Sequence, residues 1–387
     1  MQETAVKAVQ WSEASAVSSD GFILLNSFFK PIFVNRAATK ILTAKGQAAG
    51  QETGHQEAGM RMDHRLKVLF TVDTEVWPET PNWYEHHMKD DIARDLDGST
   101  PRGEFGVFYQ AEMLRQHGLK GVFFAESLYT FCVGLESLKR TVDRIGSLGH
   151  EIGLHSHAEW LKRPGSPLPA QKNLMHKYNL DEQCFLISSG LEKLRAAGVG
   201  RVRSYRAGGF GANADTLTAL ARNGIPFDSS YNRAWAGTHC VIASRPMLQP
   251  ELVSGVFEFP VAMFEDWPGH SRPAQLCAAS SGEMIASLKA ARQNGWRYFV
   301  IVSHSFELIY RGPRPAPDWV VIRRFKELCE FLAVHPSDFE TITFEDIQPE
   351  LIPPANGARP ITAGAHHTAW RMAEQAYRRI CAPPRWQ

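Results

Sequence analysis

From residue 66 onward, apolar runs of strand length alternate along the chain with segments of helical periodicity. Strands that alternate with helices of about a dozen residues predict a parallel sheet covered by helices. Seven or eight such units in about 280 residues favour a closed (β/α) barrel over an open sheet. The predicted strands are residues 66–73, 120–126, 151–155, 201–205, 226–230, 256–261, 298–303 and 340–344, and the predicted helices are residues 105–117, 135–148, 181–197, 214–223, 282–294 and 319–334.

Polar residues stand at or near the carboxyl end of most of these strands. In a barrel, the carboxyl ends of the strands meet at one face, and active sites are built there. The sequence therefore predicts one site to which several strands contribute. The residues concerned are Asp73, Glu75, Glu126, His155, Arg206, Glu258 and His304.

Residues 149–160 read Gly-His-Glu-Ile-Gly-Leu-His-Ser-His-Ala-Glu-Trp, which gathers His155, His157 and Glu159 directly after an apolar run. If the chain is extended there, His155 and His157 share a face because side chains alternate along a strand. A helical turn instead places His155 beside Glu159. Either conformation brings at least two metal-binding side chains together, and a surface loop of histidines is the alternative without a metal.

Three further stretches accompany this one: residues 70–75 (FTVDTE), 204–209 (SYRAGG) and 301–307 (IVSHSFE). The order and content of the four stretches resemble the polysaccharide deacetylase family, the NodB-homology carbohydrate esterases of the family 4 type. The resemblance spans residues 66–346 and is closest to the WalW-like branch, which is associated with lipopolysaccharide biosynthesis. Its most specific piece is the Gly-His-Glu-Ile-Gly before a histidine, and Phe-Asp-Ser-Ser at 227–230 also looks like a recurrent family stretch.

This resemblance implies a distorted (β/α) barrel of seven or eight strands, with one divalent metal, usually zinc, that serves the hydrolysis of an acetamide. By the matching positions, Asp73 corresponds to the general base and Glu75 takes the place of the metal-binding acid. His155 matches the first metal-binding histidine, Arg206 the arginine that orients the base, and His304 the general acid.

Two departures from the family pattern leave alternatives open. The first stretch has Asp73 and Glu75 separated by one residue instead of two adjacent aspartates, so the roles of base and ligand can be exchanged. For the second histidine ligand, an ungapped match selects Glu159, and a shortening by two residues selects His157. We favour His157, because imidazole suits zinc, whereas two carboxylates with one histidine favour a harder metal. Glu159 then holds an imidazole N–H.

Aromatic residues close to these stretches are candidates for stacking on a sugar. We predict this role for Trp160, Phe210 and Trp267. The run Glu265-Asp266-Trp267 also corresponds loosely to a further family motif near the base.

The composition excludes several classes of partner. The 387 residues carry a formal net charge of +1, so no overall field attracts nucleic acid or an anionic membrane. The six cysteines lie far apart and include no Cys-x-x-Cys pair, which suits a reducing compartment. We find no signal peptide pattern and no apolar run long enough to span a bilayer, and we therefore expect a cytoplasmic protein.

Three regions are predicted along the chain. Residues 1–64 form an extension with a PAS-like hairpin, followed by a flexible linker rich in Gly, Gln and Ala, and Met60 or Met62 is an alternative start. Residues 65–350 form the barrel. Residues 351–387 form a tail with an amphipathic helix at 368–380, for which packing on its own domain is favoured over a partner or a membrane surface.

These observations predict a metal-dependent hydrolase that removes an N-acetyl or O-acyl group from a sugar of a polysaccharide, a lipopolysaccharide or its precursor. The alternatives are the hydrolysis of a different, non-glycan C–N amide bond at the same site, or a catalytically degenerate barrel that binds glycan.

Overall fold

The computed structural model describes residues 64–77, 88–161, 173–312, 314–354 and 357–382. The chain divides into two compact units, Met1–Arg61 and Met62–Gln387, and every described residue lies in the second unit. The PAS-like hairpin and the linker predicted before residue 64 fall outside the described residues.

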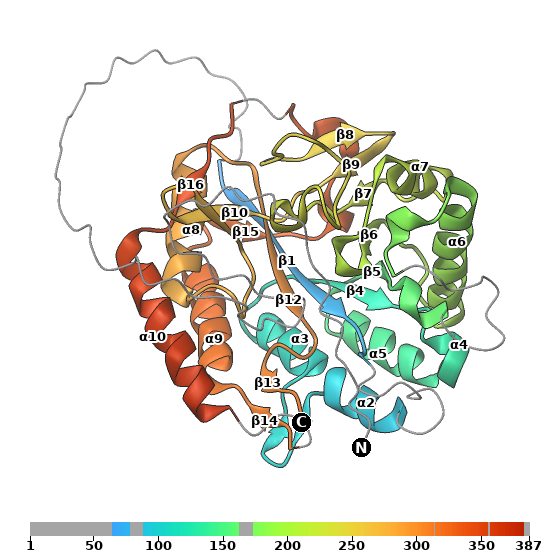
Figure 1. Ribbon diagram of the computed structural model, residues 1–387, viewed down its shortest axis with the longest axis horizontal. Coiled ribbons are helices and arrows are strands. Elements are labelled where there is room, and N and C mark those ends of the chain that lie inside the picture. Colours follow the sequence, from blue (N-terminus) through green and yellow to red (C-terminus); the bar gives the residue numbers. More distant parts are fainter. Residues whose placement is uncertain (1–63, 78–87, 162–172, 313, 355–356, 383–387) are drawn as a thin grey trace, which may run out of the picture. The chain divides into compact units, whose positions relative to one another are not determined.

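A nine-stranded sheet forms the centre of the described part of the chain (Figure 1). Its strands follow the order β12-β1-β4-β5-β6-β7-β9-β8, and β15 pairs with β1. All pairs in this sheet are parallel except that of β8 with β9. The bounds are β1 (Leu66–Thr74), β4 (Val122–Glu126), β5 (Glu151–Ser156), β6 (Ser204–Ala207), β7 (Phe227–Asp228), β8 (Glu251–Val253), β9 (Val256–Glu258), β12 (Tyr298–His304) and β15 (Phe339–Thr341).

The sheet curls, because the chain that leaves β9 returns to the edge of β12. Val261 forms a parallel bridge with Val300, and the amide of Ala262 donates to the Val300 carbonyl at 3.1 Å. Further along, Gln275 forms a parallel bridge with Val302. The described residues therefore adopt a mixed α/β fold around a curled, mainly parallel sheet.

Helices follow most of the parallel strands, as the alternation predicts. The described helices are α2 (Met88–Asp95), α3 (Val107–Gln116), α4 (Thr130–Val133), α5 (Glu136–Ser147), α6 (Leu180–Ala196), α7 (Ala214–Arg222), α8 (Ser281–Gln293), α9 (Trp319–Val334) and α10 (Ala365–Cys381). Three of them begin with a capping box, in which the side chain before the helix accepts from the third helical amide: Asn179 for α6, Asn213 for α7 and Ser280 for α8. These caps explain why the helices start within a residue of the predicted positions.

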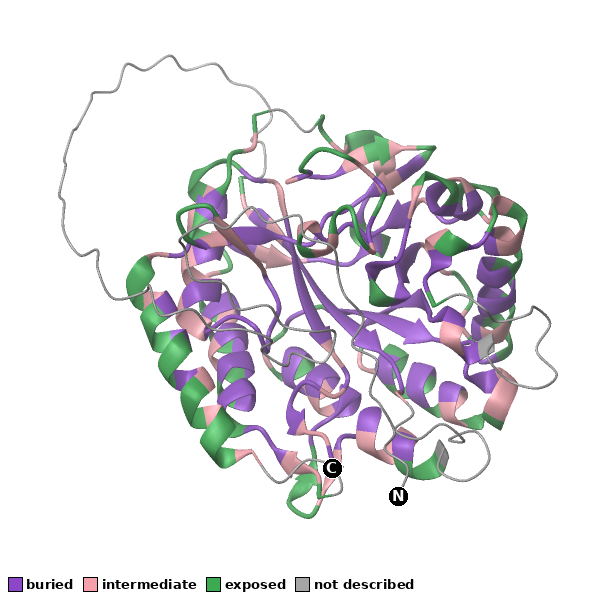
Figure 2. Ribbon diagram, in the orientation of Figure 1, coloured by how far each residue is buried: buried purple, intermediate pink, exposed green. Residues whose placement is uncertain are grey.

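Both faces of the sheet are buried, as the almost continuous apolar run of β1 requires. Val68, Phe70 and Val72 face the helices, whereas Leu69 faces the concave side. On the concave side, Phe344 packs against Phe124, Phe227 and Phe259, with ring centroids 6.2, 5.4 and 5.2 Å away. Figure 2 shows the central strands buried along nearly their whole length.

Several strands are shorter than predicted. The predicted strand at 201–205 begins only at Ser204, where pairing with β7 starts. The predicted strand at 256–261 ends at Glu258, because the next residues turn toward β12. The predicted strand at 340–344 ends at Thr341, because Phe344 starts a 3₁₀ turn and fills the concave face.

Smaller elements that periodicity did not predict surround this core. The three-stranded sheet β11-β10-β16 comprises β10 (Met263–Trp267), β11 (His270–Pro273) and β16 (Ile361–Thr362). Two two-stranded ribbons are formed by β2 (Ser99–Thr100) with β3 (Gly103–Glu104) and by β13 (Ile309–Tyr310) with β14 (Ala316–Pro317). These short strands lie outside the alternation of apolar runs and helices from which the other strands were predicted.

The predicted tail helix is present as α10 and packs against other elements of the second unit. Its buried face is ionic: Arg371 pairs with Asp266 and Arg378 pairs with Asp318, each at 2.7 to 2.8 Å. Its outward face is exposed, as Figure 2 shows, and includes Trp370. No helix in the described part of the chain is long and apolar enough to cross a membrane.

Candidate metal centre

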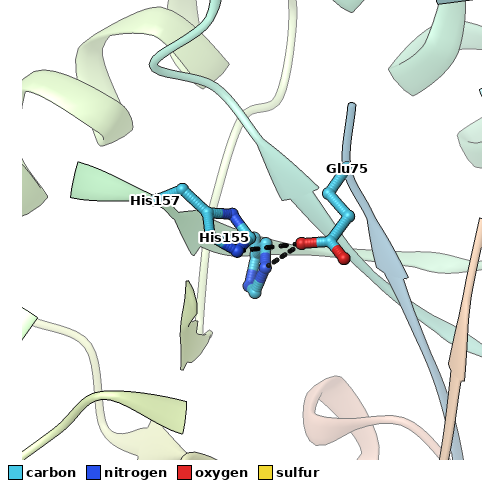
Figure 3. Close-up of side chains that lie close together, drawn as sticks. All are labelled: Glu75, His155 and His157. Atoms are coloured by element: carbon cyan, nitrogen blue, oxygen red, sulfur yellow. Dashed lines mark hydrogen bonds and ion pairs between the residues drawn. The ribbon is translucent and has the colours of Figure 1, made fainter. Parts of the chain in front are cut away.

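Three side chains from two strand ends converge on one point. Among the described residues, Glu75, His155 and His157 form a group whose ligand atoms all lie within 4.8 Å of one another. The Nε2 atoms of His155 and His157 lie 3.3 and 3.0 Å from Glu75 Oε2, and Figure 3 shows both rings turned toward this carboxylate. All three side chains are buried.

The backbone explains this convergence. Glu75 follows the last residue of β1, and His155 lies in β5 with His157 one residue beyond its end. The chain at 155–157 is extended, so alternation places both imidazoles on one face, and the 3₁₀ turn begins only at Ala158. Gly208 makes room for His157, because a Cβ there would lie 2.5 Å from the ring carbon Cδ2.

Each imidazole is held from behind by an oxygen. Nδ1 of His155 lies 2.8 Å from the Arg206 carbonyl, so this N–H donates and Nε2 keeps its lone pair for a metal. Nδ1 of His157 lies 3.1 Å from Glu126 Oε2, which also accepts from the His157 amide at 2.5 Å. Such oxygen partners are typical of histidines that bind metals.

Glu126 occupies the position that the sequence assigned to Glu159. Glu126 and His155 are partners in register across β4 and β5, so Glu126 reaches the site from the neighbouring strand. Glu159 lies outside the group of three ligands, although its charge contributes to the electrostatics of His157. The position of Glu126 at the end of a predicted strand is the sequence signal for it, but that signal carried no specific role.

Charge is concentrated in this group. Burial opposes ionisation of Glu75, yet the neighbouring His157 and His155 hold the pKa of its carboxyl well below the ordinary value. Burial also opposes protonation of His157, but Glu75 and Glu126 hold the pKa of its imidazole well above the ordinary value. The two acids therefore favour a positive charge at this point. Two imidazole nitrogens and one carboxylate oxygen form a donor set that fits a divalent metal such as zinc.

Beside Glu75, His155 and His157, Arg206 fixes Asp73. Its Nη1 donates to Asp73 Oδ1 at 2.7 Å and to Thr71 Oγ1 at 2.8 Å. Its Nε and Nη2 donate to the carbonyl and hydroxyl of Ser229 at 2.8 and 2.9 Å, and its guanidinium lies 4.5 Å over the ring of Phe124. The guanidinium is thus completely buried and fixed in direction, and so is the carboxylate that it holds.

On the other side of Asp73 lies His304, at the end of β12. Its Nε2 is 3.7 Å from Asp73 Oδ2 and 3.8 Å from Glu75 Oε1, and its Nδ1 is 2.6 Å from Glu307 Oε1. Burial lowers the pKa of this imidazole, but Glu307 and the other two carboxylates outweigh burial and raise it to about 9. Sequence reasoning assigned no role to Glu307, although its spacing of three residues from His304 was visible.

The three aromatic residues predicted to stack on a sugar lie in different environments. Trp160 is only 3% exposed and packs against Tyr129 with centroids 5.8 Å apart, so its indole is part of the core and presents no free face to a sugar. Phe210 is buried 5.9 Å from the Arg206 guanidinium, with a backbone φ of 57° that a bulky residue rarely adopts. Trp267 is 37% exposed at the end of β10, where the adjacent Asp266 is bonded to α10.

One aromatic residue at the site was not predicted. The indole of Trp77 lies edge-on to the His157 ring, with centroids 4.8 Å apart. It follows Glu75 by two residues, but nothing in the sequence distinguishes it from the tryptophans of the core.

Comparisons with known proteins give distant similarities. No family model matches the chain, and no curated protein matches it. Among solved structures, the chain is similar to a candidate polysaccharide deacetylase from Mycobacterium smegmatis, with 20% identity, coverage of 78% of this chain and 97% of that chain, and a TM-score of 0.49. It is also similar to the family 4 carbohydrate esterase from Streptomyces lividans, solved with acetate, with 14% identity, coverage of 76% and 97%, and a TM-score of 0.37. A third similar structure is the 4-alpha-glucanotransferase from Thermococcus litoralis, with 10% identity, coverage of 73% of this chain and 40% of that chain, and a TM-score of 0.45.

Proposed function

We propose that this chain is a hydrolase that holds one divalent metal, zinc, and removes an N-acetyl group from a sugar of a polysaccharide, a lipopolysaccharide or its precursor. The observation that carries this proposal is the group of Glu75, His155 and His157, whose ligand atoms lie within 4.8 Å of one another. A carboxylate–arginine pair and a histidine–glutamate pair stand directly beside it. Together these groups supply a metal site, a base and an acid for amide hydrolysis.

The residues present fit zinc. Two imidazoles and one carboxylate are donors that would hold a zinc ion, as in many catalytic zinc sites. A zinc ion held there supplies a polarised acyl carbonyl and a water whose pKa is lowered to about 7.

Asp73 is suited to the role of general base. Arg206 fixes the direction of its carboxylate, because one carboxylate oxygen accepts from the guanidinium at 2.7 Å. The other oxygen faces His304 across 3.7 Å, which leaves it accessible from the site. Asp73 therefore accepts the proton of the attacking water, whereas Glu75, in contact with both imidazoles, serves as the ligand.

His304 is suited to the role of general acid. Glu307 accepts from Nδ1, so the second nitrogen, Nε2, points into the site and carries the proton that is given up. In the reaction, the water oxygen bonds to the acyl carbon and the C–N bond breaks. Asp73 takes up one proton of the water, and His304 delivers its proton to the departing amine nitrogen.

The geometry also supports a choice between the two predicted second ligands. His157 lies in the group of three with Glu75 and His155, and we assign the second histidine position to it. The resulting set of two nitrogens and one oxygen favours zinc over a harder metal.

We further infer a distorted (β/α) barrel of the NodB type, a place in the WalW-like branch and a cytoplasmic substrate that is a glycan precursor. The curled parallel sheet with its Val261–Val300 bridge supports the barrel. The four sequence stretches support the branch, and the six widely spaced cysteines, which suit a reducing compartment, support the cytoplasmic substrate.

The test is acetate release from N-acetylglucosamine oligomers by protein that is first stripped with a chelator and then reloaded with zinc. We expect activity only after reloading. Asp73→Asn should retain zinc and lose about 10²- to 10⁴-fold in kcat, because it lacks only the base. Glu75→Gln and His155→Ala should lose zinc as well, and His335→Ala, which alters a histidine at the end of α9, serves as the control.

The outcomes separate the competing functions. Zinc retention without acetate release, but with release of ammonia or an amine from small amides, identifies a different amidase. A protein that retains no stoichiometric zinc and binds glycan is a degenerate barrel, and the proposal is then wrong.

A further inference from the structure

Two arginines from different helices meet at the backbone carbonyl of Cys277. Nη1 of Arg378, in α10, donates to this oxygen at 3.2 Å, and Nη1 of Arg324, in α9, donates to it at 3.0 Å. Cys277 lies between β11 and α8, at the end of the segment that bridges to β12. The tail helix therefore contacts the chain immediately next to the candidate active site.

A buried carboxylate holds each guanidinium in place. Asp318 accepts from Nε of Arg378 at 2.7 Å and also caps α9 by accepting from the Val321 amide. Glu374, in α10, accepts from Nε and Nη2 of Arg324 at 3.0 and 2.7 Å. Charged groups that are buried and paired in this way have little freedom to rearrange, because an unpaired partner would be costly.

The backbone at Cys277 is hydrogen-bonded to Glu307. Its amide donates to Glu307 Oε2 at 3.0 Å, and the side chain of Gln275 donates to Glu307 Oε1 at 2.6 Å. The segment itself is fastened to β12, since the Leu276 amide donates to the Val302 carbonyl at 2.9 Å. Glu307 Oε1 in turn lies 2.6 Å from Nδ1 of His304.

We propose that Arg378 is a positioning residue for His304, acting through the Cys277 backbone and Glu307. This inference rests on the proposed function, in which His304 protonates the leaving amine. Without the Arg378 guanidinium, the Cys277 carbonyl keeps only the Arg324 donor, and the buried Asp318 loses its cation. Residues 275–277 then hold the Glu307 carboxylate in a less defined direction, and the imidazole that depends on it loses its alignment.

The reaction offers a readout that a general loss of structure would not produce. An amine leaves poorly without a proton, whereas 4-nitrophenolate leaves without one, so only the amide substrate depends on the general acid. We compare Arg378→Met with wild type on N-acetylglucosamine oligomers and on 4-nitrophenyl acetate. The adjacent Arg379→Met is the matched control, because residue 379 is exposed on the same helix.

We expect kcat on the amide to fall about tenfold in Arg378→Met. This is less than the roughly 10²- to 10⁴-fold that a general acid contributes, because His304 is misaligned and not removed. The KM, the zinc content and the rate on the ester should stay within about twofold of wild type. Arg378→Lys, which restores a cation opposite Asp318, should recover part of the loss. Equal losses on both substrates, or an unchanged amide rate, would show that Arg378 has no positioning role.

A second measurement separates this proposal from the proposed function. In protein with ¹⁵N-labelled histidine, the Nδ1 proton of His304 that is bonded to Glu307 should give a resonance that shifts or broadens in Arg378→Met but not in Arg379→Met. If wild type hydrolyses neither substrate, the proposed function fails, and this resonance alone decides the positioning role. An unchanged resonance in a folded Arg378→Met or Arg378→Lys protein overturns it.

Discussion

Glu126 shows how one residue outside the proposed set of ligands holds a side chain of the candidate site in place. It accepts from both the amide and the ring of His157, and from the Leu128 amide at 2.7 Å. These bonds select the tautomer of His157 that turns Nε2 toward Glu75. The carboxylate is completely enclosed, so no water can take its place.

We therefore expect Glu126→Gln to weaken zinc binding about 10- to 100-fold, because an amide holds the imidazole N–H less strongly than a carboxylate does. Competition with a chromogenic chelator measures the affinity without any substrate. Glu136→Gln, at an exposed position in α5, should bind zinc as wild type does. Equal affinities for all three proteins would contradict the role assigned to Glu126.

At the residue scale, the sequence selected residues that the structure brings close together, but not the acids that hold their side chains. Asp73, Glu75, His155, His157, Arg206 and His304 were selected because polar residues at strand ends must meet, and the structure brings them together. Glu126 and Glu307 gained their partners only through strand register and a turn. Trp160 was chosen for its position next to the motif, but the turn that follows carries it into the core.

Among the elements, the short segment after β15 connects several strands through one side chain. Phe344 is fully buried on the concave side of the sheet and contacts one phenylalanine each from β4, from β7 and from the chain after β9. It thus joins β4, β7 and the chain after β9 in one apolar cluster.

Removing this ring in Phe344→Ala should lower the free energy of unfolding by about 3 to 5 kcal/mol, because a large cavity replaces the shared contacts. Denaturant titration followed by circular dichroism measures the change. The control is Phe185→Ala on α6, whose ring is 43% exposed and whose loss should cost less than about 1 kcal/mol. Comparable losses in both variants would contradict a special role for Phe344.

At the element scale, helices were easier to predict than strands. Helices of nine or more residues reveal their period, and three of them begin at the recognisable caps Asn179, Asn213 and Ser280. The strands β7 and β9 have only two and three residues, and partners far away in sequence decide where their pairing begins. For α10, the pattern predicted an amphipathic helix that packs on its own domain, but not that Arg371 and Arg378 face inward, where they pair with Asp266 and Asp318.

For the molecule as a whole, buried acids make stability depend on pH. The carboxyl of Glu151, the first residue of β5, is buried. The Ser204 hydroxyl and the Glu345 amide donate to it at 2.7 and 3.0 Å. Burial raises its pKa from 4.5 to about 7, despite these hydrogen bonds. Folding therefore favours the protonated form of Glu151. The contribution of this protonated carboxyl to the free energy of unfolding is complete below pH 4.5 and is lost as the pH rises to about 7.

In Glu151→Gln the loss of stability between pH 4.5 and pH 7 should disappear, because an amide does not ionise. The Ser204 hydroxyl can rotate so that it accepts a hydrogen bond from the new amide. Between pH 4.5 and pH 7, the unfolding free energy of wild type should fall relative to the variant by on the order of 3 kcal/mol. Urea titrations at several pH values give this difference. Glu330→Gln, at an exposed position in α9, should follow wild type, and a pH-independent difference for Glu151→Gln would refute the assignment.

The position of β1 has a consequence for how the protein is made. This strand leaves the ribosome first among those of the sheet, yet one of its neighbours is β12, and Thr71 bonds to Ile301 across 230 residues. Contacts of such separation form slowly, because a long loop must close before they contribute. Glu75 therefore lies beside an open strand edge until β12, which ends at His304, has been synthesised. Chains arrested before β12 should accordingly depend on chaperones to protect the unpaired edge of β1.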